Sequence, residues 1–161
     1  MKAKVKNLGL MAVFACLSMA VAAESSVVSR YGTLTTKLVD PEDDYTGAER
    51  NIFLNGKKIP SATTPYDLEE SVERVFQFEE KDVFLITSSF GGAACPATFR
   101  FITVSPHGAT STEDFGTCSD ILEIENSGSV ITVKMPVFNS EKEEYESFSY
   151  HVEKGLLTSS K

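Results

Sequence analysis

The sequence of 161 residues contains no tryptophan, only two histidines and only three cysteines. Without tryptophan, it lacks the ring best suited to stack on a sugar. A zinc site is disfavoured because the chain offers a poor set of ligands. The histidines are His107 and His151, and two of the cysteines are far apart and form no CxxC pair. No Gly-x-Ser-x-Gly and no phosphate-loop Gly-Lys-Ser/Thr is present. We therefore expect no metal, no cofactor and no catalytic residues.

Long hydrophobic runs are also missing, apart from one at the N-terminus. Three lysines precede the apolar stretch from Leu8 to Val21, and small residues suited to cleavage follow it at Ala22 and Ala23. The stretch is short for the roughly 20 residues that a membrane span needs. We expect residues 1–23 to be a signal peptide that is cleaved near Ala22/Ala23.

The mature chain, residues 24–161, is then one β domain in the periplasm or outside the cell, with no membrane span. Cys16 is the alternative, as a lipidated cysteine in a lipoprotein. Phe14 argues against this because it is bulky where such a site requires a small residue.

Positive charge is scarce in the mature chain. The signal segment carries three lysines and no acid, so 12 Lys and Arg remain against 23 Asp and Glu, a formal charge of −11. This balance argues against nucleic acid, whose phosphates attract basic residues. It is compatible with a cationic protein partner, although an acidic surface also serves solubility alone.

The two cysteines of the mature chain, Cys95 and Cys118, predict one disulfide because an exported chain meets oxidising conditions. They bracket a segment whose midpoint is the turn-like sequence 105–108. A two-residue loop at Pro106-His107 pairs residues whose numbers sum to 213, which places the cysteines opposite each other. A three-residue loop using Gly108 remains the alternative and shifts the register by one residue.

Apolar and polar residues alternate over most of the remaining chain, with tight turns between the segments. Asn55-Gly56 is the strongest hairpin signal. The run from Val83 to Phe90 begins with residues that are apolar on both faces, as in a central strand covered on two sides. We expect an all-β antiparallel meander of about nine short strands, barrel-like or alternatively a sandwich. The segment 65–76 is helix or strand, with a hairpin of 72–78 and 83–90 favoured. The tail 158–161 is expected to fray.

The stretch from Ser88 to Pro96 has the most unusual composition. Its glycines and small residues allow close approach of a partner's backbone, and the predicted disulfide holds one of its ends. The alternative is a simple connection between core strands. The candidate binding loop consists of Ser88, Ser89, Phe90, Gly91 and Gly92, with Asp120 nearby.

Other polar groups have simpler explanations. Ser119, Asp120 and His107 are the residue types of a catalytic triad, but we expect His107 at the far end of the hairpin. The acidic segment 40–44 lacks the ligand spacing of an EF-hand loop, so we expect a solvated turn rather than a calcium site. The acidic segment 141–146 is likewise expected to be a solvated turn. His151 is expected on the polar face of its strand.

The segments GGxxCPA and FGTCSD, at 91–97 and 115–120, resemble small exported bacterial proteins of unassigned function. The resemblance implies no activity. Similarity to the periplasmic lysozyme inhibitors is only of general type, in size, export and acidity.

These observations favour an exported, non-catalytic binding protein, with an inhibitor or immunity-type protein for a cationic envelope enzyme as the specific form considered. The alternatives are an envelope hydrolase with an unrecognised site and a carrier of a small ligand.

Overall fold

The computed structural model describes residues 25–39, 49–60, 69–89, 94–137 and 144–161. These residues form twelve β-strands and no helix, so none of the described segments is a helix able to cross a membrane. The strands are β1 (Ser25–Ser29), β2 (Gly32–Val39), β3 (Glu49–Leu54), β4 (Lys57–Lys58), β5 (Glu69–Gln77), β6 (Asp82–Ser89), β7 (Thr98–Ser105), β8 (Gly108–Ser111), β9 (Glu123–Ser127), β10 (Val130–Pro136), β11 (Tyr145–His151) and β12 (Leu156–Ser160).

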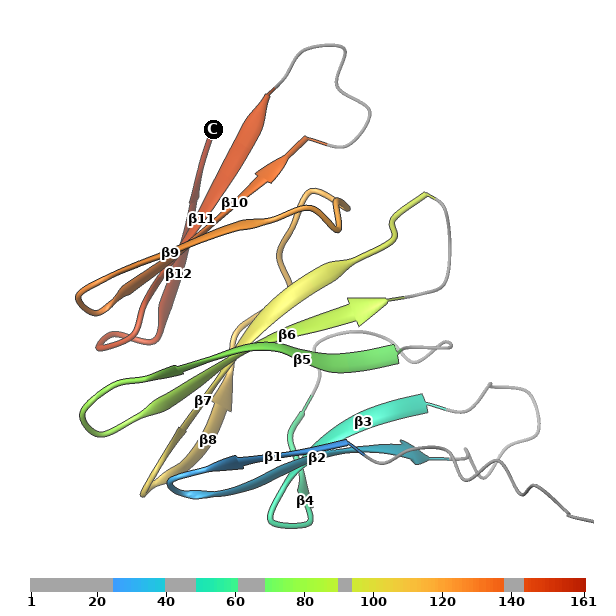
Figure 1. The fold of residues 1–161 in the computed structure, drawn as a ribbon, viewed down its shortest axis with the longest axis vertical. Coiled ribbons are helices and arrows are strands. Elements are labelled where there is room, and N and C mark those ends of the chain that lie inside the picture. The colour runs from blue at the N-terminus through green and yellow to red at the C-terminus, as the bar shows by residue number, and fades with distance from the viewer. Residues whose placement is uncertain (1–24, 40–48, 61–68, 90–93, 138–143) are drawn as a thin grey trace, which may run out of the picture.

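The strands form three antiparallel sheets, each built from four consecutive strands. We call them sheet A (β1–β4), sheet B (β5–β8) and sheet C (β9–β12). Sheet B lies between the other two, and the three sheets stack as layers (Figure 1). Because neighbouring strands are also consecutive in sequence, short turns connect most of them.

Two hydrophobic cores separate the three layers. The core between sheets A and B contains Leu34, Ile52, Ile59, Phe84, Ile86, Ile102 and Val104. The core between sheets B and C is richer in aromatic residues and includes Phe99, Phe101, Phe115, Phe148 and Tyr150. Sheet B therefore has both faces buried, because alternate residues of β6 and β7 point into opposite cores.

The sequence pattern of each strand matches its layer. In β10, which has one face in the core, buried Ile131, Val133 and Met135 alternate with half-buried residues. In β6, every residue from Asp82 to Ile86 is buried, which confirms the expected strand with two covered faces. The turn at Asn55-Gly56 has positive φ angles of 49° and 81°, as a type I′ hairpin requires.

The all-β antiparallel fold is confirmed, and the sandwich alternative fits where the barrel does not, because the barrel is not closed. The described segments alone contain twelve strands, more than the expected nine or so. The favoured hairpin of 72–78 with 83–90 is present as β5 and β6. The expected frayed tail was wrong, since β12 pairs with β11 from Leu156 to Ser160.

Candidate functional site

The predicted disulfide between Cys95 and Cys118 is present, with a Cα–Cα separation of 4.5 Å. The two-residue loop is also confirmed, since Ser105 pairs with Gly108 and Ile102 with Ser111. Further from the turn, the register shifts by one residue, because Phe99 pairs with Phe115. The cysteines lie beyond this bridge, outside the regular strands.

The candidate binding loop is only partly described. Ser88 is buried within β6, where its hydroxyl donates a hydrogen bond to Glu70 Oε1 at 3.5 Å. Ser89 is half-buried at the end of β6, and Asp120 is exposed. Phe90, Gly91 and Gly92 lie outside the described residues. A binding role for this loop stays a prediction, with Ser88 facing the interior.

Next to Ser88 lies a group of buried charges that the sequence analysis missed. Arg100 Nη2 forms an ion pair with Glu70 Oε1, and both side chains are buried. The carboxylate oxygens of Asp114 are also buried and accept no hydrogen bond from any residue that the structure describes. Burial raises the pKa of Glu70, the Arg100 guanidinium lowers it, and the negative charge of Asp114 raises it further. The one sequence signal was an arginine inside the otherwise uncharged strand TFRFITVS.

At the opposite end of the molecule, hairpin tips of all three sheets lie together (Figure 1). We call this the hairpin end. Arg30 lies in the β1–β2 turn, where its guanidinium donates two hydrogen bonds to Oδ1 of buried Asp82, at 2.7 and 2.9 Å. The backbone N–H of Arg30 donates to Asp82 Oδ2 at 2.7 Å. Its guanidinium also donates to the backbone carbonyls of Phe78, Glu79 and Lys81 in the β5–β6 tip. The hydrogen bond to Asp82 is the main reason why the pKa of Arg30 is raised.

A second connection joins the β5–β6 tip to sheet C. Lys81 Nζ donates to the backbone carbonyl of Val152 at 3.1 Å and lies 3.9 Å from the carboxylate of Glu153. Deeper between the sheets, the hydroxyls of Thr103 and Tyr150 are hydrogen-bonded at 2.7 Å. Arg30 and Lys81 therefore link one tip to both neighbouring sheets.

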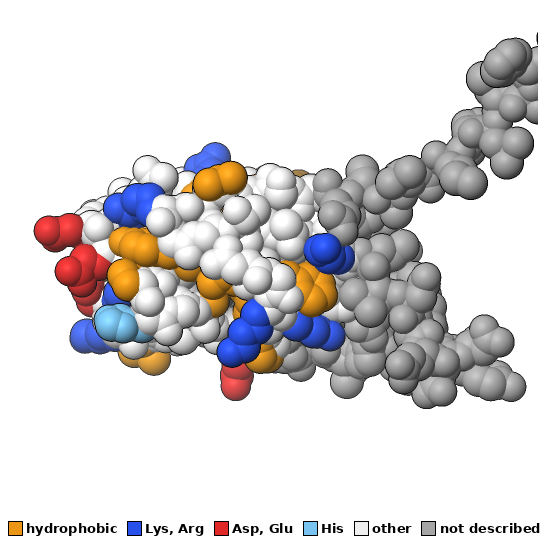
Figure 2. All heavy atoms as spheres, turned by 90° about the horizontal axis from the view of Figure 1, so that it is seen from below, with side chains coloured by type: hydrophobic (Ala, Val, Ile, Leu, Met, Phe, Trp, Pro, Cys, Tyr) orange, Lys and Arg blue, Asp and Glu red, His pale blue; other side chains and the backbone are white. Residues whose placement is uncertain are grey.

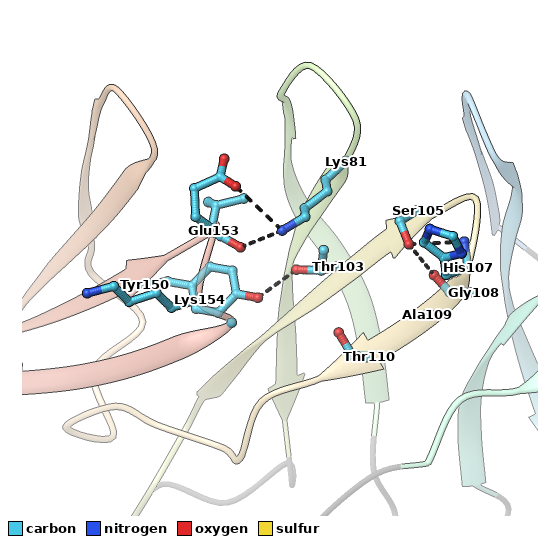
Figure 3. Close-up of a pocket in the computed structure, with 12 residues that line it drawn as sticks. Lys81, Thr103, Ser105, His107, Gly108, Ala109, Thr110, Tyr150, Glu153 and Lys154 are labelled. Carbon is cyan, nitrogen blue, oxygen red and sulfur yellow. Dashed lines mark hydrogen bonds and ion pairs between the residues drawn. The ribbon is translucent and has the colours of Figure 1, made fainter.

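A groove of about 300 Å³ opens between the β7–β8 hairpin and the β11–β12 tip. Tyr150, Glu153 and Lys154 of sheet C lie on one side, and Ala109 and Thr110 of β8 lie on the other (Figure 3). We call it the sheet-C groove. Its lining mixes hydroxyl, basic and acidic groups, which suits polar contacts with a partner.

A smaller notch of about 100 Å³ lies between the β5–β6 and β11–β12 tips. Phe78, Lys81 and three exposed carboxylates, those of Glu79, Glu80 and Glu153, line it. Viewed from the side of sheet A, acidic side chains lie at the outermost tip of one end of the molecule, with basic side chains and a histidine beside them (Figure 2). This acidic notch has the size and charge to receive the end of a basic side chain.

The described residues do not bring together a catalytic triad. Ser119 Oγ is engaged with the backbone of Ile121, whereas His107 is exposed in the β7–β8 turn at the hairpin end. His151 is half-buried on β11. No group of three or more His, Cys, Asp or Glu residues within the described segments is arranged to hold a metal ion.

No protein-family model, curated protein or solved structure matches this chain.

Proposed function

We propose that the protein is an exported, non-catalytic binding domain whose partner is a cationic protein of the cell envelope. The observation that carries this proposal is the hairpin end, where tips of three sheets are linked to one another and present an acidic notch beside a polar groove. An inhibitor or immunity-type role toward a basic envelope enzyme is the specific form that we favour.

The links at the hairpin end support binding because they reduce the cost of ordering loops on association. Immobilising a flexible surface side chain or loop consumes part of the binding free energy. Here the β5–β6 tip is already held by Arg30 from sheet A and by its own Lys81 to sheet C. A partner would meet a surface whose shape is set before contact.

The charges at the hairpin end support a cationic partner. Glu79 and Glu80 are exposed and form no ion pair with any described residue, and Glu153 is exposed beside Lys81. Carboxylates in this arrangement attract a basic surface over several ångströms at physiological salt. The formal charge of −11 on residues 24–161 acts in the same direction.

The proposed compartment rests on two independent features. The N-terminal sequence has the basic, apolar and small-residue segments of a signal peptide. The Cys95–Cys118 disulfide belongs to an oxidising environment such as the periplasm or the cell exterior.

Neither alternative role has comparable support. A small-ligand carrier requires an internal cavity, but stacked aromatic rings occupy the core between sheets B and C, with the Phe101 and Tyr150 centroids 4.7 Å apart. For a hydrolase, the perturbed carboxyl of Glu70 is buried and paired with Arg100.

The test is affinity capture from an envelope extract at low salt, with the captured proteins identified by mass spectrometry. We expect basic proteins on the wild type and their loss on the triple variant Glu79→Gln, Glu80→Gln, Glu153→Gln. The matched control, Glu73→Gln, Glu123→Gln, Glu144→Gln, removes three carboxylates distant from the notch. Equal capture by the two triple variants, or no captured protein on the wild type, would refute the proposal.

A further inference from the structure

Strand β8 is an exposed edge of the central sheet. It pairs with β7 on one side and has no strand on its other side within the described part of the chain. From Gly108 to Thr112 the edge carries no charged residue and no proline. Gly108, Thr110 and Ser111 are exposed, and Ala109 is half-buried.

The backbone groups on the free side of β8 can be assigned from the register. The Thr112 amide donates to the Phe101 carbonyl at 2.9 Å, so the backbone groups of Thr112 point toward β7. In an antiparallel pair this direction alternates along the strand. The N–H and C=O groups of Ser111 and Ala109 therefore point away from β7, toward solvent.

A groove lies on each side of this edge. The sheet-C groove adjoins Ala109 and Thr110, with a volume of about 300 Å³. On the other side, a groove of about 440 Å³ separates β8 from Ile59 and Pro60 of sheet A. We call it the sheet-A groove. The side chains of a strand added to β8 would enter these two grooves alternately.

The opposite edge of sheet B is protected against such pairing. Strand β5 carries exposed Glu73 and Arg74, and its register is interrupted by a bulge between Val72 and Arg74. Charges and bulges are the devices by which natural edge strands avoid unwanted partners. Strand β8 has neither a charge nor a bulge, so the two edges of sheet B differ in their protection against pairing with another strand.

We propose that the protein binds an extended segment of its partner by strand addition to β8. This inference rests on the proposed binding function and names the mode of recognition. Hydrogen bonds to the free groups of Ala109 and Ser111 supply affinity, and the two grooves select the side chains.

The linings of the grooves define the segment. Ile59, Pro60 and Ala109 favour apolar side chains on the sheet-A side, whereas the hydroxyls and charges of the sheet-C groove favour polar ones. Exposed Glu113, at the end of the sheet-A groove, suits a lysine or arginine of a cationic partner. A second copy fits less well, since sheets A and C flank β8 and hinder the approach of an equally flanked edge.

Ser111→Pro is the test variant, because it removes the free N–H without breaking a hydrogen bond to β7. Val28→Pro is the matched control on another uncharged edge, β1. The backbone N–H of Asn55 donates to the Thr33 carbonyl, so the backbone groups of Thr33 point away from β1. Val28 pairs with Thr33 across the two strands, and its own N–H and C=O therefore point away from β2, toward the free side of β1. Val28 is 77% exposed. Ser111→Lys keeps the N–H but places a charged side chain at the sheet-A groove.

The probe is a set of synthetic peptides, obtained by selecting a random peptide library on the wild-type protein. We expect peptides with alternating apolar and polar residues, bound about tenfold or more weakly by Ser111→Pro and Ser111→Lys and unchanged by Val28→Pro. Methylation of every second backbone nitrogen of a peptide removes the N–H donors on one of its two edges. One of the two alternating methylation patterns should abolish binding, and the other should not. The Ala109 and Ser111 amides should exchange with solvent quickly in the free protein and slowly in the complex.

Three outcomes would overturn the inference: no selected peptide, equal binding by wild type and Ser111→Pro, or loss with Val28→Pro instead. Self-association of the wild type that Ser111→Pro abolishes would identify a second copy as the occupant and also overturn it. If the cationic partner is lost with the Glu79, Glu80 and Glu153 variant but retained by Ser111→Pro, the proposed function stands and strand addition alone fails.

Discussion

Arg100 and Glu70 form an ion pair in which the side chains are 0% and 1% exposed. Asp114 adds a second buried carboxylate nearby, and its negative charge opposes the effect of Arg100 on Glu70. Removing one partner of a buried pair leaves an uncompensated charge, which costs about 3–5 kcal/mol. We expect Arg100→Leu to lower the free energy of unfolding by about this amount in urea titrations. Arg74→Leu, on exposed β5, should change it by less than about 0.5 kcal/mol.

The same cluster should make stability depend on pH. Burial raises the pKa of Glu70 above its ordinary value of 4.5, so the folded protein holds the proton more tightly than the unfolded chain does. As the pH rises above 4.5, the unfolded chain loses this proton first, and stability falls until the pH passes the raised pKa. Glu70→Gln should remove this fall in the free energy of unfolding with rising pH, measured by denaturation at a series of pH values, whereas Glu73→Gln should preserve it. Parallel curves for wild type and Glu70→Gln would contradict the prediction.

The disulfide should contribute substantially to stability. Cys95 and Cys118 close a loop with a sequence separation of 23, and a cross-link of this span restricts the unfolded chain by about 3 kcal/mol in the chain-entropy model. The double variant Cys95→Ser, Cys118→Ser should lose about that much in chemical denaturation. A thiol assay on the native protein should detect no free cysteine at these positions, and two free thiols would refute the bond.

Arg30 should be irreplaceable by lysine at the hairpin end. Its planar guanidinium contacts the Asp82 carboxylate and three carbonyls at once, which a single ammonium group cannot reproduce. Arg30→Lys should therefore speed amide hydrogen exchange in the β5–β6 tip without changing it in β10. Lys37→Arg is the control for a conservative basic exchange within sheet A. Unchanged exchange in the tip would show that Arg30 does not hold it.

The Thr103–Tyr150 hydrogen bond should stabilise the contact between sheets B and C. Tyr150→Phe keeps the ring stacked on Phe101 but leaves the buried Thr103 hydroxyl without its partner. We expect a loss of about 1–2 kcal/mol in the free energy of unfolding. Tyr145→Phe is the matched control because Tyr145 is 50% exposed. Equal effects of the two changes would contradict this role.

Local pairings were the predictable part of the fold. The turn residues Pro106-His107 set the β7–β8 register, and Asn55-Gly56 set the β3–β4 turn, because hairpin geometry depends on a few adjacent residues. The grouping of strands into three layers was not predictable. Alternation shows that a strand has one buried face, but it does not show which sheet covers that face.

The candidate site was harder to predict for the same reason. Arg30 lies far from Asp82 in sequence, and only the stacking of sheets A and B brings the two together. Arg100 lies far from Glu70, and the pairing of β5, β6 and β7 within sheet B brings this second pair together. Composition drew attention to the Gly-rich stretch 88–96. The free edge of β8 was hidden because edge position is a property of the finished sheet, not of the sequence GATS.

The burial of sheet B on both faces has a consequence for folding. Each sheet is a meander of neighbouring strands, so each can form through contacts of low sequence separation. Sheets A and C each need one apolar surface covered, whereas sheet B needs two. A chain that emerges N-terminus first completes sheet B before strands β9–β12 are available. Until those last strands dock, Phe99 and Phe101 face water, and the aromatic half of the protein is most vulnerable to aggregation during this interval.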